Sequence, residues 1–354
     1  MKESRDTDRK QLSDQQIAEV VRLSATLNVS YITVDTHWDY PDYMQRWVSA
    51  IRAVGKHVWF RILPNQWEDD NGAVGVMTPA DFEASEGAFL AANSALFQSG
   101  DILDPCAEPE NGIYWQAQYG TNWTANGPNL ATSEYNAFIR DTSDIADAAL
   151  HDRSVYGVLT NIRSINAYVA THPSVLERAT VSKLGMITVD SYPEGSTVDP
   201  ATAANARVSQ LAQIEQLWNV PVVIGEMGFS DRNQVDDATQ AAVLTAEFQA
   251  LAAIPYIRAI NYWVGTGTNQ TGGFTQLFDG TQGTWATRPA ANVVAAFFAA
   301  HDAQADATAT ATASDAPATA TASPTGSSSR TPTYHAHRPK CRRTAPCPSM
   351  SAGA

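Results

Sequence analysis

The sequence has few of the features that would tie the chain to a membrane or to a disulfide framework. Its 354 residues include only three cysteines, of which Cys106 alone lies in the compact part of the sequence. Cys341 and Cys347 lie near the C-terminus and could pair with each other there. No run of about 18 apolar residues occurs, so no segment is expected to span a membrane. The first sixteen residues are charged and lack the apolar stretch of a secretory signal.

Basic residues are also scarce. The chain has 23 Lys and Arg against 37 Asp and Glu, a formal net charge of −14. A surface of that sign repels phosphate backbones, so a nucleic-acid partner is not expected. An uncharged polymer fits this charge better, and the hydrophobic content of 44% is sufficient for a large core.

The composition changes near residue 303. Residues 303–354 are rich in Ala, Thr, Ser and Pro and carry five Lys or Arg and two Asp, so the acidity belongs to the preceding residues. Such a segment cannot bury enough apolar area to fold, and we predict a disordered tail. Its basic end with two cysteines is either a small adaptor or the product of a shifted reading frame. The predicted organisation is an N-terminal extension (1–10), a catalytic domain (11–302) and the tail (303–354).

Short apolar runs alternate with helical patterns between residues 11 and 302. Ser13 with Gln16, and Thr78 with Pro79 and Asp81, carry the signals of helix N-termini. The apolar runs are YITVD (31–35), HVWFRIL (57–63), DILDPCA (101–107), SVYGVLT (154–160), GMITVD (185–190), VPVVIGE (220–226) and IRAINYWV (257–264).

Near-continuous apolar strands separated by helices indicate a parallel sheet that is covered on both faces. Seven strands are visible and a helix precedes the first. We therefore predict the α/β class and a (β/α)8 (TIM) barrel whose first strand is missing or hidden in residues 1–11. An open doubly wound sheet is the alternative. Such a sheet usually has a Gly-rich phosphate loop after its first strand, and none is present.

Polar and aromatic side chains follow the runs, where a barrel of this kind holds its chemistry. They are Asp35, His37 and Trp38 after the first run; Arg61, Asn65 and Trp67 in or after the second; Glu108, Glu110 and Asn111 after the third; Asn161 after the fourth; Asp190 and Tyr192 at the fifth; Glu226 at the sixth; and Trp263 in the last.

Glu226 ends a strongly apolar strand, where a carboxylate is costly unless it is used or paired. Glu108 ends a strand three positions earlier, on the opposite side of an eight-stranded barrel. Two carboxylates about 5–5.5 Å apart, one an acid and one a nucleophile, are what retaining glycoside hydrolysis needs. Glu110 is the fallback acid or a substrate contact.

The motifs AEPEN (107–111) and IGEMG (224–228) resemble those of the retaining (β/α)8-barrel glycoside hydrolases of clan A, which include cellulases and β-mannanases. The resemblance covers residues 11–302. It implies that Glu108 is the acid/base and Glu226 the nucleophile. It also implies that Tyr192 hydrogen-bonds the nucleophile, that Trp263 forms the floor of the sugar subsite, and that Arg61 lies near the nucleophile.

Two positions depart from the pattern of that family. Ala107 stands where the family has an Asn that contacts the sugar, so Asn111 or Asn161 is expected to replace it. Arg61 lies on the third strand by our count, whereas the family's arginine comes from the second. Sugar rings stack on aromatic faces, and Trp38, Trp67, Trp115, Trp123 and Trp263 follow strand ends.

Other interpretations stay open at this point. Asp35 and His37 could serve a metal-dependent isomerase or hydrolase, but few further histidines converge, and sugar binding is preferred. A non-catalytic carbohydrate-binding barrel is the second alternative. We expect a carbohydrate substrate, no cofactor or metal, and a monomer. The substrate class predicts secretion. A truncated N-terminus would reconcile this with the missing signal, and otherwise the protein is cytoplasmic.

Overall fold

The computed structural model describes residues 2–68, 75–150, 158–193, 198–229, 236–266, 276–280 and 284–314. Residues 1–309 form one compact unit. The remaining residues, with Cys341 and Cys347, form a second unit, and beyond residue 314 they lie outside the described part of the chain. The predicted boundary at 302/303 therefore stays a prediction. No helix among the described residues is long and apolar enough to cross a membrane.

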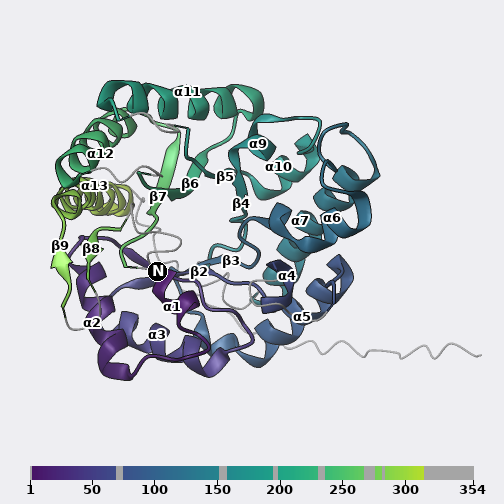
Figure 1. The fold of residues 1–354 in the computed structure, drawn as a ribbon, viewed down its shortest axis with the longest axis horizontal. Coiled ribbons are helices and arrows are strands. Elements are labelled where there is room, and N and C mark those ends of the chain that lie inside the picture. The colour runs from purple at the N-terminus through teal and green to yellow at the C-terminus, as the bar shows by residue number, and fades with distance from the viewer. Residues whose placement is uncertain are drawn as a thin grey trace, which may run out of the picture. The chain divides into compact units, whose positions relative to one another are not determined.

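Seven parallel strands form two sheets inside a ring of helices (Figure 1). One sheet has the order β1-β2-β3 and the other β4-β5-β6-β7. Leu159 forms an isolated bridge to Ile102 on β3, and the Glu108 N–H after β3 donates to the Ser164 carbonyl on β4 at 2.7 Å, which links the two sheets. The strands are β1 (Tyr31–Val34), β2 (His57–Arg61), β3 (Ile102–Asp104), β4 (Ser164–Asn166), β5 (Ile187–Asp190), β6 (Val222–Met227) and β7 (Ile257–Tyr262). A small antiparallel pair, β8 (Phe278–Asp279) and β9 (Ala286–Thr287), lies apart from them.

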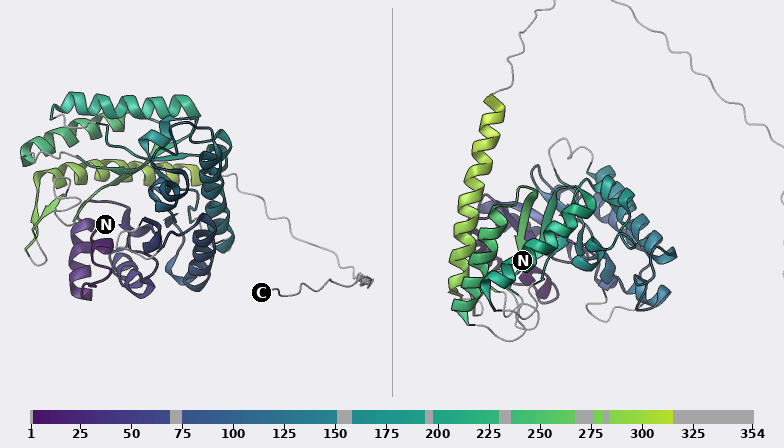
Figure 2. Two further views of the ribbon diagram at one scale, coloured as in Figure 1. Left: turned by 45° about the vertical axis from the view of Figure 1, so that its right-hand side comes forward. Right: turned by 90° about the horizontal axis from the view of Figure 1, so that it is seen from above.

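Helices separate the consecutive strands, as the alternating pattern predicts. The capping boxes predicted at Ser13 and Thr78 are both present. The helices are α1 (Lys2–Asp6), α2 (Asp14–Ala25), α3 (Pro41–Ala53), α4 (Asn65–Glu68), α5 (Pro79–Ala92), α6 (Ile113–Tyr119), α7 (Leu130–Ala149), α9 (Ala167–Thr171), α10 (Arg178–Leu184), α11 (Pro200–Trp218), α12 (Asp237–Ala252) and α13 (Pro289–Ser314), with short 3-10 turns η1 (Ser94–Leu96) and η2 (Pro109–Asn111). Figure 2 shows helices from the first quarter of the chain on one side of the strands and α11 and α12 on the other.

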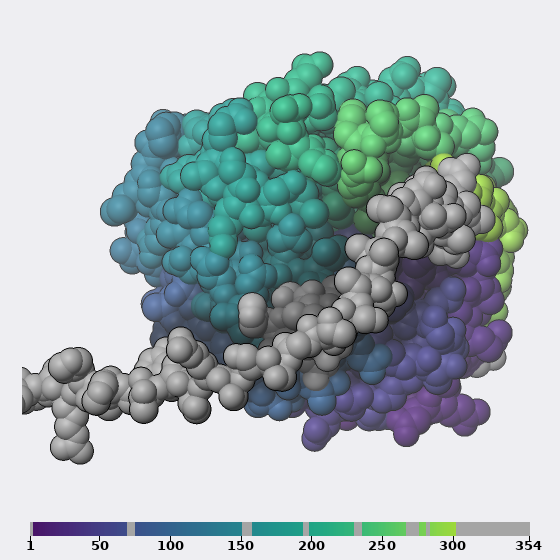
Figure 3. All heavy atoms as spheres, turned by 180° about the vertical axis from the view of Figure 1, so that it is seen from behind, coloured from purple at the N-terminus to yellow at the C-terminus, as the bar shows by residue number. Residues whose placement is uncertain are grey.

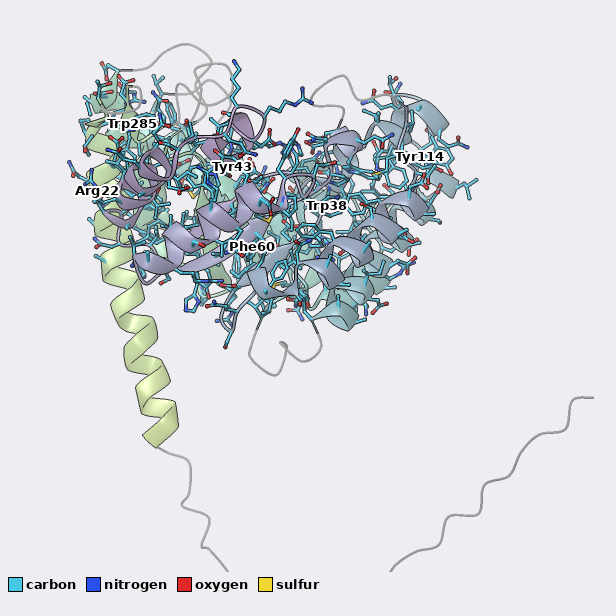
Figure 4. The ribbon with its side chains drawn as sticks, turned by 90° about the horizontal axis from the view of Figure 1, so that it is seen from below. Arg22, Trp38, Tyr43, Phe60, Tyr114 and Trp285 are labelled. Carbon is cyan, nitrogen blue, oxygen red and sulfur yellow. The ribbon has the colours of Figure 1, made fainter. Side chains whose placement is uncertain are left out.

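Most of the core lies between the strands and the helices. Phe60 on β2 and Tyr43 on α3 are both fully buried there (Figure 4). A separate cluster of Trp59, Ile102, Ile162 and Val223 fills the space between the strands. Alternate residues of each strand thus face the helices or the barrel interior.

The fourth predicted strand differs from the observed one. Residues 151–157 lie outside the described part, Leu159 forms an isolated bridge to Ile102, and β4 follows at Ser164–Asn166. The strand was predicted too early in the chain because β4 begins and ends with polar residues, Ser164 and Asn166, which an apolar pattern does not mark. The main-chain N–H of Ser164 donates to Asp104 at 3.0 Å, for example. No described residue ahead of Tyr31 forms a strand, as expected for a barrel whose first strand is missing.

Candidate active site

Glu226 lies near the carboxyl end of β6, with its side chain 16% exposed. The residue before it must be small. A Cβ at Gly225 would come within 2.5 Å of both the Asp190 carboxylate and the Ser164 hydroxyl. Arg61 and Asn261 donate to the Gly225 carbonyl at 2.6 and 2.9 Å. The local sequence therefore fixes the main chain from which the Glu226 carboxylate projects.

Two side chains, Arg61 and Tyr192, fix the Glu226 carboxylate. Arg61 on β2 lies 2.7 Å from it and 3.3 Å from Asp190. Burial alone lowers the pKa of the Arg61 guanidinium, but the Glu226 and Asp190 carboxylates raise it, and the net pKa is well above its ordinary value. The Tyr192 hydroxyl donates to Glu226 at 3.2 Å. Burial and the Glu226 charge raise the pKa of Tyr192, which keeps this hydroxyl protonated.

Glu108 stands opposite, after β3. Its main chain has φ 51° and ψ 56°, a left-handed conformation that costs a residue with a side chain about 1 kcal/mol. The surroundings hold it there: its N–H donates to the Ser164 carbonyl at 2.7 Å, and Pro109 begins the η2 turn. Strain of this kind is found at functional sites, where it aims a side chain.

The environment favours the protonated form of Glu108. Burial first, and then the charges of Glu226 and Glu110, raise the pKa of its carboxyl well above the ordinary value. Asp190 is affected in the same way. Burial and the charge of Glu226 raise the pKa of Asp190, although the nearby Arg61 lowers it. The site thus holds a cation, Arg61, that pairs with Glu226 and Asp190, and two carboxyls, Glu108 and Asp190, whose pKa values are raised.

One oxygen each of Glu108, Asp190 and Glu226 lie within 4.8 Å of one another. Three carboxylates at this spacing are a possible cation site. Here the Arg61 guanidinium already supplies positive charge to two of the three. The geometry therefore places two carboxyls, Glu108 and Glu226, so that they face each other and can act on a substrate bond between them.

A pocket of about 90 Å³ opens over the two glutamates. Two of its walls come from residues that the sequence did not indicate, Arg5 and Glu68, which form an ion pair with each other. Glu68 follows the carboxyl end of β2, so its position in the sequence could have indicated it as a site residue. Arg5 precedes every predicted strand, and no sequence signal marks it. The lining residues are Arg5, Asp35, Arg61, Glu68, Ala107, Glu108, Glu226 and Trp263.

Trp263 forms the aromatic wall of this pocket. It follows β7, and its main-chain N–H donates to the Met227 carbonyl at 2.7 Å. Its ring stands edge-on to the Tyr192 ring, with 6.4 Å between the centroids. The Trp263–Val264 peptide bond is cis. Ala107 also faces the pocket, at the position where the resemblance implied an Asn.

Glu110 is directed away from the pocket. Its carboxylate accepts hydrogen bonds from the Tyr135 hydroxyl at 3.0 Å and from the Asn166 N–H. Burial raises the pKa of Glu110 to about 7, although these hydrogen bonds lower it. Of the two glutamates around Pro109, only Glu108 reaches the pocket.

Five further polar residues were predicted at the site besides Asp190, Arg61 and Tyr192. Asp35 lines the pocket, 4.0 Å from Arg5. His37 is instead buried and bonded to Asp8 at 2.6 Å, and Asn161 donates to the Leu184 carbonyl. Asn65 and Asn111 are absent from the pocket wall. The true end of the fourth strand is Asn166, which explains why Asn161 lies elsewhere.

Trp38 and Trp67 differ most from expectation, because both lie in the core. Trp38 is 6% exposed and packs on Phe82 and Phe89, while Trp67 is fully buried against Phe82 and Phe138. Trp115 and Trp123 belong to the same aromatic core. Their ring faces are covered by other rings, so they offer no stacking surface to a sugar.

Comparison with known proteins places the fold. No protein-family model and no curated protein matches the sequence. Among solved structures, a β-glucosidase is similar at a TM-score of 0.57 and 14% identity, covering 81% of this chain and 88% of that one. A GH5_18 protein from Bifidobacterium longum subsp. infantis gives 0.57 and 16%, with coverages of 80% and 73%. A GH113 β-mannanase from Alicyclobacillus acidocaldarius gives 0.51 and 16%, with coverages of 82% and 94%.

These likenesses show that the chain has the (β/α)8-barrel fold of those proteins. At such low identities they establish the fold alone. What the site does must be argued from its own residues.

Proposed function

We propose that the protein is a retaining glycoside hydrolase that cleaves a β-linked glycan by double displacement. The observation that carries this proposal is that Glu108, whose pKa burial and neighbouring charges raise, faces Glu226, which forms an ion pair with Arg61, with oxygens within 4.8 Å of each other. The names of the similar structures, β-glucosidase and β-mannanase, support the substrate class.

In this proposal each glutamate has one role. Glu226 attacks the anomeric carbon and forms a glycosyl ester, while Glu108 gives its proton to the departing glycosidic oxygen. Glu108, now ionised, then takes a proton from a water molecule that attacks the same carbon, and Glu226 leaves as a carboxylate. Arg61 and Tyr192 orient the Glu226 carboxylate through their contacts of 2.7 and 3.2 Å.

The pocket supports a sugar ligand in the remaining positions. Trp263 offers an aromatic face, and sugar C–H faces stack on such rings. Asp35, Glu68 and Arg5 surround it with charged hydrogen-bonding groups suited to sugar hydroxyls. Since Asn111 and Asn161 do not line the pocket, we assign the role of the family's missing Asn to this charged group.

The test compares two aryl β-glycosides, one with an acidic phenol as leaving group and one with a poor leaving group. Glu108→Gln should retain kcat/KM on the first and lose at least about 100-fold in kcat/KM on the second, because only the second needs a proton donor in the step that forms the glycosyl ester. Its kcat should fall on both, because water then lacks its base. Glu226→Gln should be inactive on both. Glu110→Gln is the matched control, since its side chain faces Tyr135 and Asn166.

Full activity of Glu226→Gln would contradict the assignment of the nucleophile. Sugar binding without turnover by the unsubstituted protein would instead favour a non-catalytic carbohydrate-binding barrel. Loss of activity on addition of a chelator would favour the metal-dependent alternative.

A further inference from the structure

A buried ion pair joins two helices behind the candidate active site. Arg207 on α11 and Glu247 on α12 are 0% and 1% exposed, and neither lines the catalytic pocket. Nε of Arg207 donates to Glu247 at 3.0 Å, and a second guanidinium nitrogen lies 2.9 Å from the same oxygen. Figure 1 shows α11 and α12 side by side on the outer side of β5 and β6. Figure 3 shows the atoms of this part of the chain, from teal to green, packed along the upper edge of the molecule.

Stability alone is a weak explanation for this buried pair. Both charges lose their water on folding, and apolar side chains of similar size often stabilise a core as well as such a pair does. What a buried arginine adds is direction, because its planar guanidinium carries five N–H groups in a fixed arrangement. The partner of the third guanidinium nitrogen of Arg207 therefore shows what the pair can hold in place.

This third nitrogen is directed at Ser191, which follows β5 and is fully buried. It donates to the Ser191 carbonyl and, at 3.1 Å, to the Ser191 hydroxyl. The same hydroxyl donates to the side chain of Gln210, a second residue of α11, at 2.7 Å. Two side chains of α11 therefore fix the carbonyl and the hydroxyl of Ser191.

Ser191 connects this network to Glu226. Its N–H donates to the Glu226 carbonyl at 2.8 Å. The next residue, Tyr192, donates its hydroxyl to the Glu226 carboxylate at 3.2 Å. Residues 191–192 thus contact both the main chain and the side chain of Glu226, so a displacement of Ser191 would change both contacts together.

Regular strand pairing is interrupted at Glu226. The register of β6 shifts against both β5 and β7 between Ile224 and Met227. An irregularity of this kind disrupts the ladder of main-chain hydrogen bonds and changes the direction of the side chains beside it. The orientation of Glu226 therefore depends on its contacts with residues 191–192 more than it would in a regular strand.

We propose that Arg207 is a positioning residue for the hydrolytic reaction. Paired with Glu247, it holds residues 191–192 in place, and these in turn keep the Glu226 carboxylate aligned for attack. Arg207 acts through Ser191 and touches neither the substrate nor the reacting atoms. This inference rests on the proposed function, because it takes Glu226 as the nucleophile.

The test removes the network while it keeps the core filled. Arg207→Met/Glu247→Leu replaces the pair by apolar side chains of similar size, keeps the net charge and leaves no unpaired charge in the core. Ile214→Ala is the control for a loss of stability, because Ile214 is fully buried on the same helix, about two turns from Arg207. Both variants of the full chain are assayed well below their Tm.

The double variant should lose about 10- to 100-fold in kcat/KM, because a displaced nucleophile attacks slowly. The loss should be equal for the aryl β-glycosides with good and poor leaving groups. The inhibition constant of the sugar that they release should change less than about threefold, which separates chemistry from binding. Hydrogen exchange at residues 191–192 should become at least about tenfold faster. Ile214→Ala should lower Tm and leave kcat/KM and this exchange unchanged.

Unchanged kcat/KM in the double variant would overturn the proposal and leave the proposed function intact. A loss limited to the poor leaving group would also overturn it, because the network would then act on Glu108. An equal loss in Ile214→Ala would assign the effect to stability. If the unsubstituted protein hydrolyses neither substrate, the proposed function fails, and hydrogen exchange at residues 191–192 alone decides whether the ion pair holds this segment.

Discussion

The pH dependence of stability offers a quantitative test of the assignment of Glu110. Its side chain is 8% exposed, and burial raises its pKa from 4.5 to about 7. Replacement by Gln keeps the size and both partners: the amide oxygen accepts from the Asn166 N–H, and the amide nitrogen donates to the Tyr135 hydroxyl. Glu110→Gln therefore removes the titration and leaves the packing in place.

The magnitude follows from the difference in pKa between the folded and unfolded states. Below pH 4.5 both states hold the proton, and Glu110 contributes no pH dependence. Between pH 4.5 and 7 the unfolded state loses its proton while the folded state keeps it, so stability falls as pH rises. A difference of about 2.5 pKa units corresponds to about 3 kcal/mol in the free energy of unfolding. The folded state has lost this amount of stability once the pH is above 7.

The assay is urea unfolding of the unsubstituted protein and of Glu110→Gln at several values between pH 4.5 and 8. Other buried carboxyls, such as Glu3 with a pKa of about 6, affect both proteins equally and cancel in the difference. The variant should gain about 3 kcal/mol relative to the unsubstituted protein across this range. Asp42→Asn, at an exposed position in α3, controls for the change in net charge. A difference that does not vary with pH would refute the reasoning.

Two further predictions concern the site. Gly225→Ala places a methyl group 2.5 Å from the Asp190 carboxylate and the Ser164 hydroxyl, so it should cost about 1–3 kcal/mol and lower activity, measured by thermal unfolding and glycoside hydrolysis. Gly87→Ala, whose added Cβ would meet only the Ile145 side chain at 3.6 Å, is the matched control and should keep full activity. The alkaline limb of kcat/KM should lie well above the ordinary pKa of a glutamate, because burial and Glu226 raise the pKa of Glu108. The limb should appear with the aryl glycoside that has a poor leaving group, which needs the proton of Glu108, and should be absent with the activated one; a limb with both substrates would assign it to another group.

Sequence patterns predicted the strands that consist mainly of apolar residues and the helices that begin with a capping residue. The strands at 31–34, 187–190 and 222–227 are continuous apolar runs, and both capping boxes follow from adjacent residues. The facing positions of Glu108 and Glu226 follow from strand order alone, since strands three apart in a barrel oppose each other. Local signals and topology were sufficient for these features.

Features that depend on tertiary contacts could not be predicted from these sequence patterns. The fourth strand begins at the polar Ser164, whose main-chain N–H donates to the buried Asp104 carboxylate, a contact that an apolar pattern cannot reveal. Trp38 and Trp67 follow strand ends, but neighbouring aromatic rings from α5 and α7 cover them. Arg5 reaches the pocket only because residues 2–8 pack against the loop after β1.

The configuration of the first sugar released tests the central claim most directly. Proton NMR of the anomeric signal, recorded within minutes of adding enzyme to a β-linked substrate, separates the initial product from its later mutarotation. Facing carboxyls with oxygens within 4.8 Å predict retention, so the β-anomer should appear first. Initial appearance of the α-anomer would contradict a nucleophilic Glu226, since inversion needs a water molecule between more widely spaced carboxyls.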